Sequence, residues 1–154
     1  MRGFTLIETL IYLALFALLM SGAIGGVNAI QESAERTSKQ TILIDEALYL
    51  EGRLRTEVEH ADRIISPSKD MPSGTLTFEE DGLRVDIEQE LGSLVQRISD
   101  EDTILNDNAV KVAGIAFTRS SSANDPQHID ISLTLQAQGA PAATVYSQTV
   151  YLSP

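Results

Sequence analysis

Apolar residues fill the N-terminal part of the chain almost without interruption. The segment from Leu10 to Ile30 carries no charged residue. As an α-helix it would be about 31 Å long, close to the roughly 30 Å thickness of a bilayer's hydrocarbon core. The pattern therefore predicts a transmembrane helix. A cleavable secretory signal fits less well, because the apolar run continues past the small residues Ser21-Gly22-Ala23.

After Ile30 the sequence becomes amphipathic with the period of an α-helix. Apolar residues recur on one stripe: Leu43, Ala47, Leu50, Leu54, Val58, Ala61 and Ile65. The helix is expected to end near Ser66, because Pro67 cannot continue it. We therefore predict one continuous helix, with a transmembrane and assembly part over residues 4–30 and an amphipathic part over residues 31–66. Opposite charges four residues apart predict these surface ion pairs: Arg53–Glu57, Arg55–Glu59 and Glu59–Arg63.

Beyond Pro67 the apolar period changes to two, which is typical of half-buried β-strands. Alternation is clear around Leu76–Phe78, Leu83–Ile87 and Ile129–Leu135, and weaker around Leu94–Ile98, Val110–Phe117 and Thr144–Leu152. Asp81-Gly82 is a hairpin signal, and a change of phase at Gly114 predicts a β-bulge. Turns are expected over residues 120–126 and 139–141. Residues 67–154 should thus form an antiparallel β head domain, with one face covered by the helical stripe.

The residues before the apolar run form a specific motif. They read Gly3-Phe4-Thr5-Leu6-Ile7-Glu8, preceded by Arg2, the only basic residue before Arg36. This order, followed by a hydrophobic helix, resembles the class III signal of type IV pilins and type II secretion pseudopilins. The resemblance implies an α+β fold of the pilin-like lollipop kind, a long N-terminal helix packed on a C-terminal antiparallel sheet.

The resemblance also implies how the N-terminus is processed. A prepilin peptidase would remove a leader of residues 1–3 by cutting between Gly3 and Phe4, and Phe4 would become an N-methylated N-terminus. Glu8 would then pair with the Phe4 amine of a neighbouring subunit during assembly. The physical chemistry agrees, because an unpaired carboxylate in apolar surroundings is destabilising and a cationic partner offsets that cost. Alternatively, Glu8 reaches toward the cytoplasmic headgroups, and both states can occur at different stages.

Three glycines, Gly22, Gly25 and Gly26, lie late in the apolar helix. Two interpretations compete. Gly22 and Gly26 form a small-xxx-small pair, which lets helices approach closely. Alternatively, Gly25-Gly26 is a flexible point where the helix unwinds on assembly, since glycine disfavours helix by about 1 kcal/mol relative to alanine.

The composition limits the possible functions. The net charge of −11 argues against direct binding of nucleic acid, and the absence of cysteine removes disulfides and thiolate metal sites. Neither His60 nor His128 stands at a metal-ligand spacing. The acidic segment with Asp100, Asp102, Asn106 and Asp107 does not match the regular calcium-loop pattern. No nucleophile with a base is evident, so we expect neither an enzyme nor a bound cofactor or metal.

The predicted function is that of a minor pilin or pseudopilin. The order of elements is similar to that of J- or W-type minor subunits, and Glu8 argues against the K-type tip subunit, which usually lacks this residue. The expected partners are the prepilin peptidase, the major pilin, other minor pilins, the assembly platform and the membrane itself. Arg2 favours a cytoplasmic N-terminus, which places a single-pass protein in the cytoplasmic (inner) membrane with its head outside the cytoplasm, and in a pilus or pseudopilus after assembly. The alternative is a membrane-tethered binding or adhesin module with a pilin-like anchor.

Overall fold

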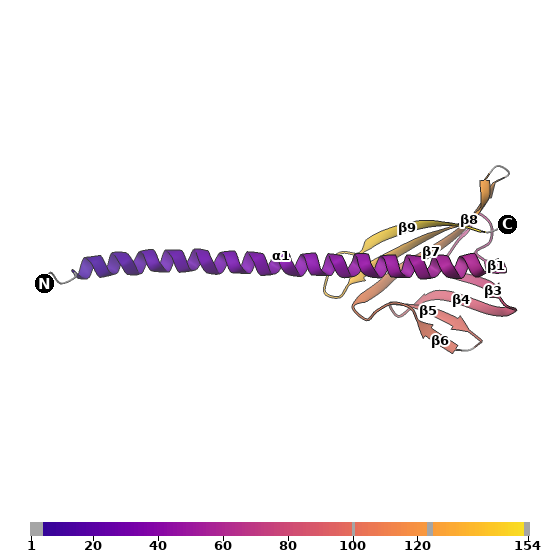
Figure 1. Ribbon diagram of the computed structural model, residues 1–154, viewed down its shortest axis with the longest axis horizontal. Coiled ribbons are helices and arrows are strands. Elements are labelled where there is room, and N and C mark those ends of the chain that lie inside the picture. The colour runs from indigo at the N-terminus through magenta and orange to yellow at the C-terminus, as the bar shows by residue number, and fades with distance from the viewer. Residues whose placement is uncertain (1–4, 100, 123–124, 153–154) are drawn as a thin grey trace. The chain divides into compact units, whose positions relative to one another are not determined.

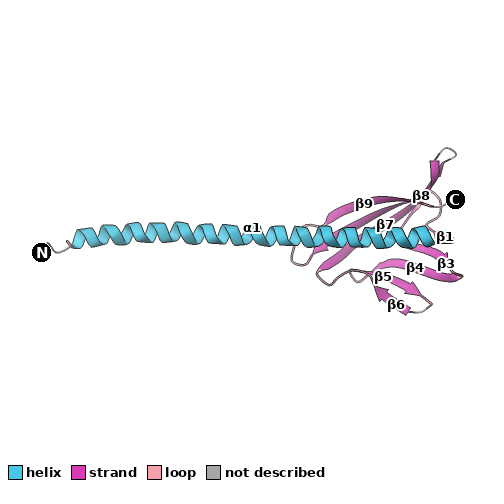
Figure 2. Ribbon diagram, viewed as in Figure 1, coloured by secondary structure: helices cyan, strands magenta, loops and turns pink. Residues whose placement is uncertain are grey.

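The computed structural model describes residues 5–99, 101–122 and 125–152. Helix α1 spans Leu6–His60 and is followed, in the described part of the chain, by nine strands. The chain divides into two compact units, Met1–Ser38 and Lys39–Pro154, so α1 contributes residues to both. Figure 1 shows the order of the elements along the chain, and Figure 2 separates the helix from the strands.

The first unit consists of the N-terminal part of α1. Its large apolar side chains are exposed throughout, from Leu6 at 79% to Ile30 at 70%. Helix α1 is long and apolar enough to cross a membrane. Its most apolar segment has a mean hydropathy of 2.2, and none of that segment is buried. A helix that is apolar on all sides requires an apolar environment, so the predicted membrane segment agrees with the observed surface.

The second unit contains two antiparallel sheets. The five-stranded sheet has the order β1-β3-β4-β5-β6, and the four-stranded sheet has the order β2-β7-β8-β9. The strand bounds are β1 Arg63–Ser66, β2 Pro72–Ser73, β3 Thr75–Glu80, β4 Leu83–Glu90, β5 Ser93–Ile98, β6 Glu101–Ile104, β7 Val110–Ser122, β8 Asp125–Ala137 and β9 Thr144–Tyr151.

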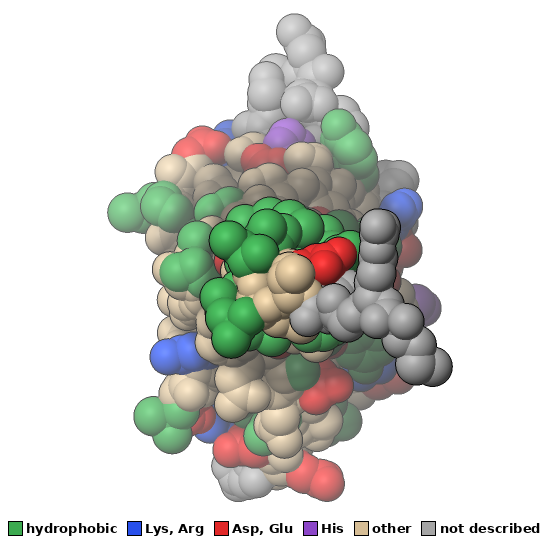
Figure 3. Space-filling view, turned by 90° about the vertical axis from the view of Figure 1, so that its left-hand side faces the viewer, with side chains coloured by type: hydrophobic (Ala, Val, Ile, Leu, Met, Phe, Trp, Pro, Cys, Tyr) green, Lys and Arg blue, Asp and Glu red, His purple; other side chains and the backbone are tan. Residues whose placement is uncertain are grey.

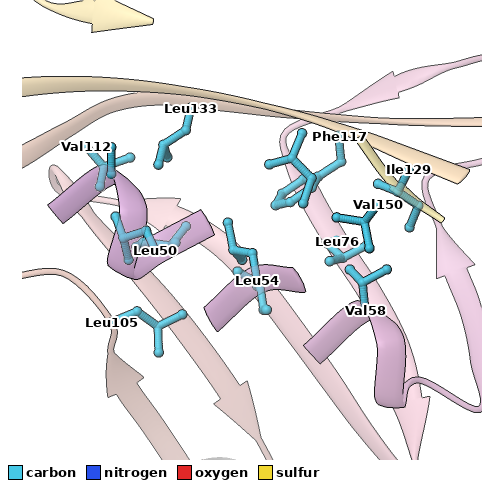
Figure 4. Close-up of a cluster of buried hydrophobic side chains, with 14 of the residues drawn as sticks. Leu50, Leu54, Val58, Leu76, Leu105, Val112, Phe117, Ile129, Leu133 and Val150 are labelled. Carbon is cyan, nitrogen blue, oxygen red and sulfur yellow. The ribbon is translucent and has the colours of Figure 1, made fainter. Parts of the chain in front are cut away.

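The core of the second unit lies between α1 and these sheets (Figure 4). Helix α1 contributes the predicted stripe through Leu43, Ala47, Leu50, Leu54 and Val58, all buried. The five-stranded sheet contributes side chains such as Leu76 and Ile87, and the four-stranded sheet contributes Phe117 and Leu133. Burying each large aliphatic side chain stabilises the fold by about 1.5–3 kcal/mol. The α+β fold class, a long helix packed on antiparallel sheets, is confirmed.

The predicted end of the helix near Ser66 is wrong, because α1 ends at His60. Strand β1 pairs instead with β3, and Asp62 N donates to Glu79 O at 2.8 Å. This pairing satisfies backbone groups and buries Ile64, whereas Ile65, which the stripe had included, is 43% exposed. As a result Arg63 pairs with Glu79 at 2.9 Å rather than with Glu59, which pairs with Arg55.

The prediction of a single sheet is also corrected, since the strands form two. Strand β2 pairs with β7, far along the chain, and its two residues carry no periodic signal. The turn expected over residues 120–126 is shorter, because β7 reaches Ser122 and β8 starts at Asp125. Other predictions are confirmed: Asp81 and Gly82 form the β3–β4 turn with φ of 50° and 76°, and the β7–β8 register shifts between Val112 and Gly114.

Asn106 connects the two sheets. It is buried, and its Oδ1 accepts a hydrogen bond from Leu94 N of β5 at 2.7 Å. Its Nδ2 donates to Val110 O of β7 at 2.8 Å. Buried polar groups are tolerated when they are hydrogen-bonded, so this amide links one strand of each sheet without leaving an unpaired group.

Candidate functional site

The start of α1 is the first part of the candidate site. The amides of Glu8 and Thr9 both donate to Thr5 O, at 3.1 and 3.3 Å, and Thr9 Oγ1 donates to Leu6 O at 2.8 Å. Glu8 therefore lies in the first helical turn, where a carboxylate interacts favourably with the helix dipole. Gly3 and Phe4, the residues predicted for cleavage and methylation, lie outside the described residues.

Glu8 is the acidic residue within an otherwise apolar surface. It is half-buried, and the neighbouring side chains of Ile7, Leu10 and Ile11 are exposed at 67%, 56% and 54%. Within the described part of the chain, Glu8 makes no ion pair. A carboxylate in an apolar medium is destabilising without a cationic partner, so the geometry leaves Glu8 available to a cation from another molecule.

The exposed apolar surface continues along the first unit. Viewed from the N-terminal side, hydrophobic side chains dominate the near end of the helix (Figure 3). A Cβ built on Gly22, Gly25 or Gly26 would meet nothing within 4 Å, so nothing in the described chain covers these positions. The helix passes through them without a break. Close helix packing and unwinding on assembly both remain predictions for this segment.

The acidic segment that follows β5 is organised by an arginine. Arg97 contacts Asp102 at 2.7 Å, Glu88 at 3.0 Å and Glu90 at 3.6 Å. The hydrogen bond to Asp102 and its charge raise the pKa of Arg97 above its usual range, and the hydrogen bond from Arg97 lowers the pKa of Asp102. Asp102 is thus engaged by a cation of the chain itself.

The other residues of the acidic segment have structural contacts. Asn106 connects the two sheets, and Asp107 N donates to Glu46 Oε1 of α1 at 2.8 Å. Asp100 lies outside the described residues. Among the residues that the structure describes, no three His, Asp or Glu side chains are grouped as a metal site would need. The contacts observed here are those of a surface that holds strands together.

Asp86 on β4 is a second carboxylate that is held by side chains of the chain itself. Partial burial raises the pKa of its carboxyl, but hydrogen bonds from Thr77 Oγ1 at 2.6 Å and from Arg84 outweigh this, so the pKa is lowered. Arg84 Nε lies 3.0 Å from Asp86 Oδ2. Thr77 and Asp86 stand opposite each other in the β3–β4 ladder, so the contact fixes the register of this hairpin.

The two histidines contact backbone and neighbouring side chains. His60 Nδ1 lies 2.7 Å from Thr56 O at the end of α1. His128 Nε2 lies 3.6 Å from Asp130 Oδ2, and its ring lies 5.6 Å from that of Tyr151. They come from different elements and contact different groups.

One buried charge was missed by the sequence analysis. Glu57 is 7% exposed and pairs with Arg53 at 2.7 Å, and Arg53 Nη2 also reaches Gln96 Oε1 at 3.3 Å. The i,i+4 spacing of Arg53 and Glu57 did predict the pair. The signal of burial was the position of Glu57, three residues after Leu54 and beside Val58 on the helical stripe.

A polar cavity of about 360 Å³ in the second unit is lined by Ser93, Asn106, Lys111 and Gln138 among others. The Lys111 side chain lies against Gly92, where a Cβ would come within 2.8 Å of it. Ser93 is the hydroxyl of this lining, and neither a histidine nor a carboxylate lines the cavity beside it.

Comparison with known proteins bears on the N-terminal segment. Residues 1–24 match the prokaryotic N-terminal methylation motif. No curated protein and no solved structure matches the chain. The matched residues contain Gly3, Phe4 and Glu8, and they lead into a helix with an exposed apolar surface. The motif indicates a prepilin of the type IV pilin or pseudopilin type, a structural subunit that prepilin peptidase processes and that assembles with other pilins.

Proposed function

We propose that this protein is a minor pilin or pseudopilin. Residues 4–30 hold it in the cytoplasmic membrane with the head outside the cytoplasm, and it enters a type IV pilus or type II secretion pseudopilus near the tip. The observation that carries the proposal is the methylation motif at residues 1–24, joined to a helix whose exposed apolar surface bears a single early carboxylate, Glu8.

In the proposed pathway the peptidase cuts between Gly3 and Phe4, and Phe4 is N-methylated. Methylation keeps the charge of the amine. Glu8 then pairs with the Phe4 amine of a neighbouring subunit. The pairing is supported by the position of Glu8 among exposed apolar side chains and by the absence of an ion pair for it in the described chain. A pair of opposite charges in an apolar environment favours one register over others, because every other register leaves both charges unpaired.

The proposed partners are the prepilin peptidase, the major pilin, other minor pilins and the assembly platform in the membrane. The chain has no cysteine, whereas many pilins that build the filament close their C-terminal region with a disulfide. This difference supports a minor role, as does the similarity of the order of elements to J- or W-type subunits.

The intact mass of the membrane-extracted protein tests this proposal. With a co-expressed prepilin peptidase, we expect the mass to fall by Met1-Arg2-Gly3 and to gain one methyl group at Phe4. Without the peptidase the mass should stay at that of the full chain. An unchanged mass beside an active peptidase and a processed control pilin would overturn the proposal and favour a membrane-tethered binding module.

A further inference from the structure

The two sheets end in four edge strands, and three of these carry features that discourage pairing with another chain. Strand β6 places Glu101 and Asp102 on its edge. Strand β1 is short and shifts register between Ile64 and Ser66. Strand β2 has two residues and begins at Pro72. Charge, irregularity, short length and proline are the means by which sheet edges avoid association.

The fourth edge strand, β9, has none of these features. It extends over eight residues, Thr144–Tyr151, with the sequence TVYSQTVY. The strand contains no charge, proline or glycine and consists largely of β-branched and aromatic residues, which favour strands. It is uncharged although the whole chain has a net charge of −11. An edge of this kind is a ready template for another strand.

The ladder between β8 and β9 shows which backbone groups are free. Leu152 N donates to Gln127 O at 2.9 Å, and the register continues without a shift along the whole strand. Hydrogen-bonded pairs alternate along an antiparallel ladder, so the residues bonded to β8 are Val150, Gln148, Tyr146 and Thr144. The N–H and C=O groups of the intervening residues point to the open edge: Val145, Ser147, Thr149 and Tyr151.

The side chain of Gln148 is a second, independent observation. Its Oε1 is buried and has no hydrogen-bond partner among the described residues. Buried acceptors are normally satisfied. Gln148 lies midway between Val145 and Tyr151, so a strand on the open edge would place one of its side chains opposite Gln148.

We propose that β9 binds a β-strand of a different chain, another pilin-type subunit, which extends the four-stranded sheet by one strand. The inference rests on the proposed function, since assembly supplies this neighbour. The partner strand is uncharged or basic, because the acidic chain would repel an acidic one. It carries a hydrogen-bond donor opposite Gln148 and apolar side chains opposite Val145 and Tyr151, which are 61% and 57% exposed.

A second copy of this chain is a poorer fit than a different subunit. Its other described edges are the ones that discourage pairing, so it would offer its own β9. Antiparallel pairing of two identical strands relates the two heads by a twofold axis perpendicular to the sheet. Such an axis reverses the head segment of α1, which packs on the face of the sheets. Two subunits anchored through the same end of α1 in one membrane do not meet in this way.

Site-specific crosslinking tests the proposal on the full chain in cells that carry the complete pilus or pseudopilus machinery. A photoreactive amino acid at Val145 should give an adduct with one other pilin-type subunit, identified by its mass. The same amino acid at Thr103, exposed on the acidic edge β6, is the matched control and should not give that adduct.

Two variants show whether the contact depends on the strand edge. Ser147→Pro removes an N–H from the open edge but none that bonds β8, and Ser147→Lys adds a charge there. Each should lower the Val145 adduct about tenfold or more, while Thr103→Lys leaves it unchanged. Should Ser147→Pro not fold, as judged by its unfolding temperature, Ser147→Lys alone decides.

The outcomes separate this inference from the proposed function. An adduct with a second copy of the chain, or an adduct that both Ser147 variants leave at full strength, would overturn edge pairing with a different subunit. Processed protein in the filament fraction without any Val145 adduct would overturn edge pairing alone. An unprocessed wild-type chain would instead overturn the proposed function.

Discussion

The leucines of the first unit and the core leucines of the second unit have opposite environments. In the first unit Leu13, Leu18 and Leu19 are exposed at 67%, 71% and 70%, whereas Leu50 and Leu54 in the second unit are fully buried. The same helix supplies both sets. A core leucine of the head has its apolar partners within the chain, whereas the exposed leucines of the first unit have none in the described chain and require an apolar environment from outside it. Matched substitutions in the two units therefore report on different processes.

The largest effect is expected from Glu8→Gln. Removing one member of an ion pair in apolar surroundings destabilises by about 3–5 kcal/mol, because the other charge is left unpaired. We expect incorporation into filaments to fall by at least about a hundredfold, with peptidase processing and head stability unchanged. The control is Glu32→Gln on the same helix, where the carboxylate pairs with an exposed Arg36. Immunoblots of sheared filaments measure incorporation, and wild-type levels for Glu8→Gln would contradict the assembly role.

Leu54→Ala should strongly destabilise the head. The side chain is fully buried between α1 and the sheets, so we expect a loss of about 2–5 kcal/mol in the free energy of unfolding. Leu18→Ala, exposed in the first unit, should leave head stability unchanged. Denaturant unfolding of the detergent-solubilised full chain, followed by tyrosine fluorescence, measures both. Equal losses of unfolding free energy for the two variants would contradict the different roles of leucine in the two units.

Arg53→Ala tests the buried carboxylate in the head. It leaves Glu57, 7% exposed, without its cation, and we expect a loss of about 1–3 kcal/mol in the free energy of unfolding. Arg55→Ala breaks the exposed pair with Glu59 and should cost about 0.5 kcal/mol or less. The comparison uses the same unfolding measurement, and a larger loss for Arg55→Ala would contradict the importance of burial.

The smallest effect is expected in the acid stability of the head. The pKa values of Asp86 and Asp102 are lowered below the ordinary value of 3.8. A carboxyl with a lowered pKa stabilises the folded state above its unfolded pKa and loses this contribution as the pH falls through the folded pKa. Head stability should therefore decrease as the pH falls from about 5 to below 3.8, and the Asp86→Asn, Asp102→Asn double variant should show a shallower decrease in unfolding temperature. Parallel curves for the two proteins would contradict the shifts.

Local patterns predicted those parts of the fold that depend on nearby residues. The helical stripe from Leu43 to Val58 and the Asp81-Gly82 hairpin follow from spacing and turn chemistry, and both are confirmed. The end of α1 was missed because it depends on a non-local contact. Strand β1 pairs with β3, for example Arg63 with Glu79, and this pairing outweighs the helical tendency. Strand β6 was missed because all of its residues are exposed, so no apolar alternation marks it.

The candidate site divides in the same way. The motif from Gly3 to Glu8 is contiguous and was readable from the sequence, whereas the partner that we propose for Glu8 belongs to another molecule. The open edge of β9 depends on which strand ends the sheet, and that order arises from pairings between distant segments. A sequence pattern shows that Thr144–Tyr151 is a strand, but the topology shows that it has a free side.

The side-chain amide of Asn106 restricts how the two sheets of the head are aligned. An aliphatic core such as the one around Leu50 and Leu133 is held by non-directional forces, which by themselves do little to stop the two sheets from sliding relative to each other. Asn106 binds Leu94 N on one sheet and Val110 O on the other, so sliding would break both bonds and strand a buried amide. A single side chain thus gives the two sheets of an aliphatic head one preferred alignment. Any partner that binds the head therefore meets one defined surface.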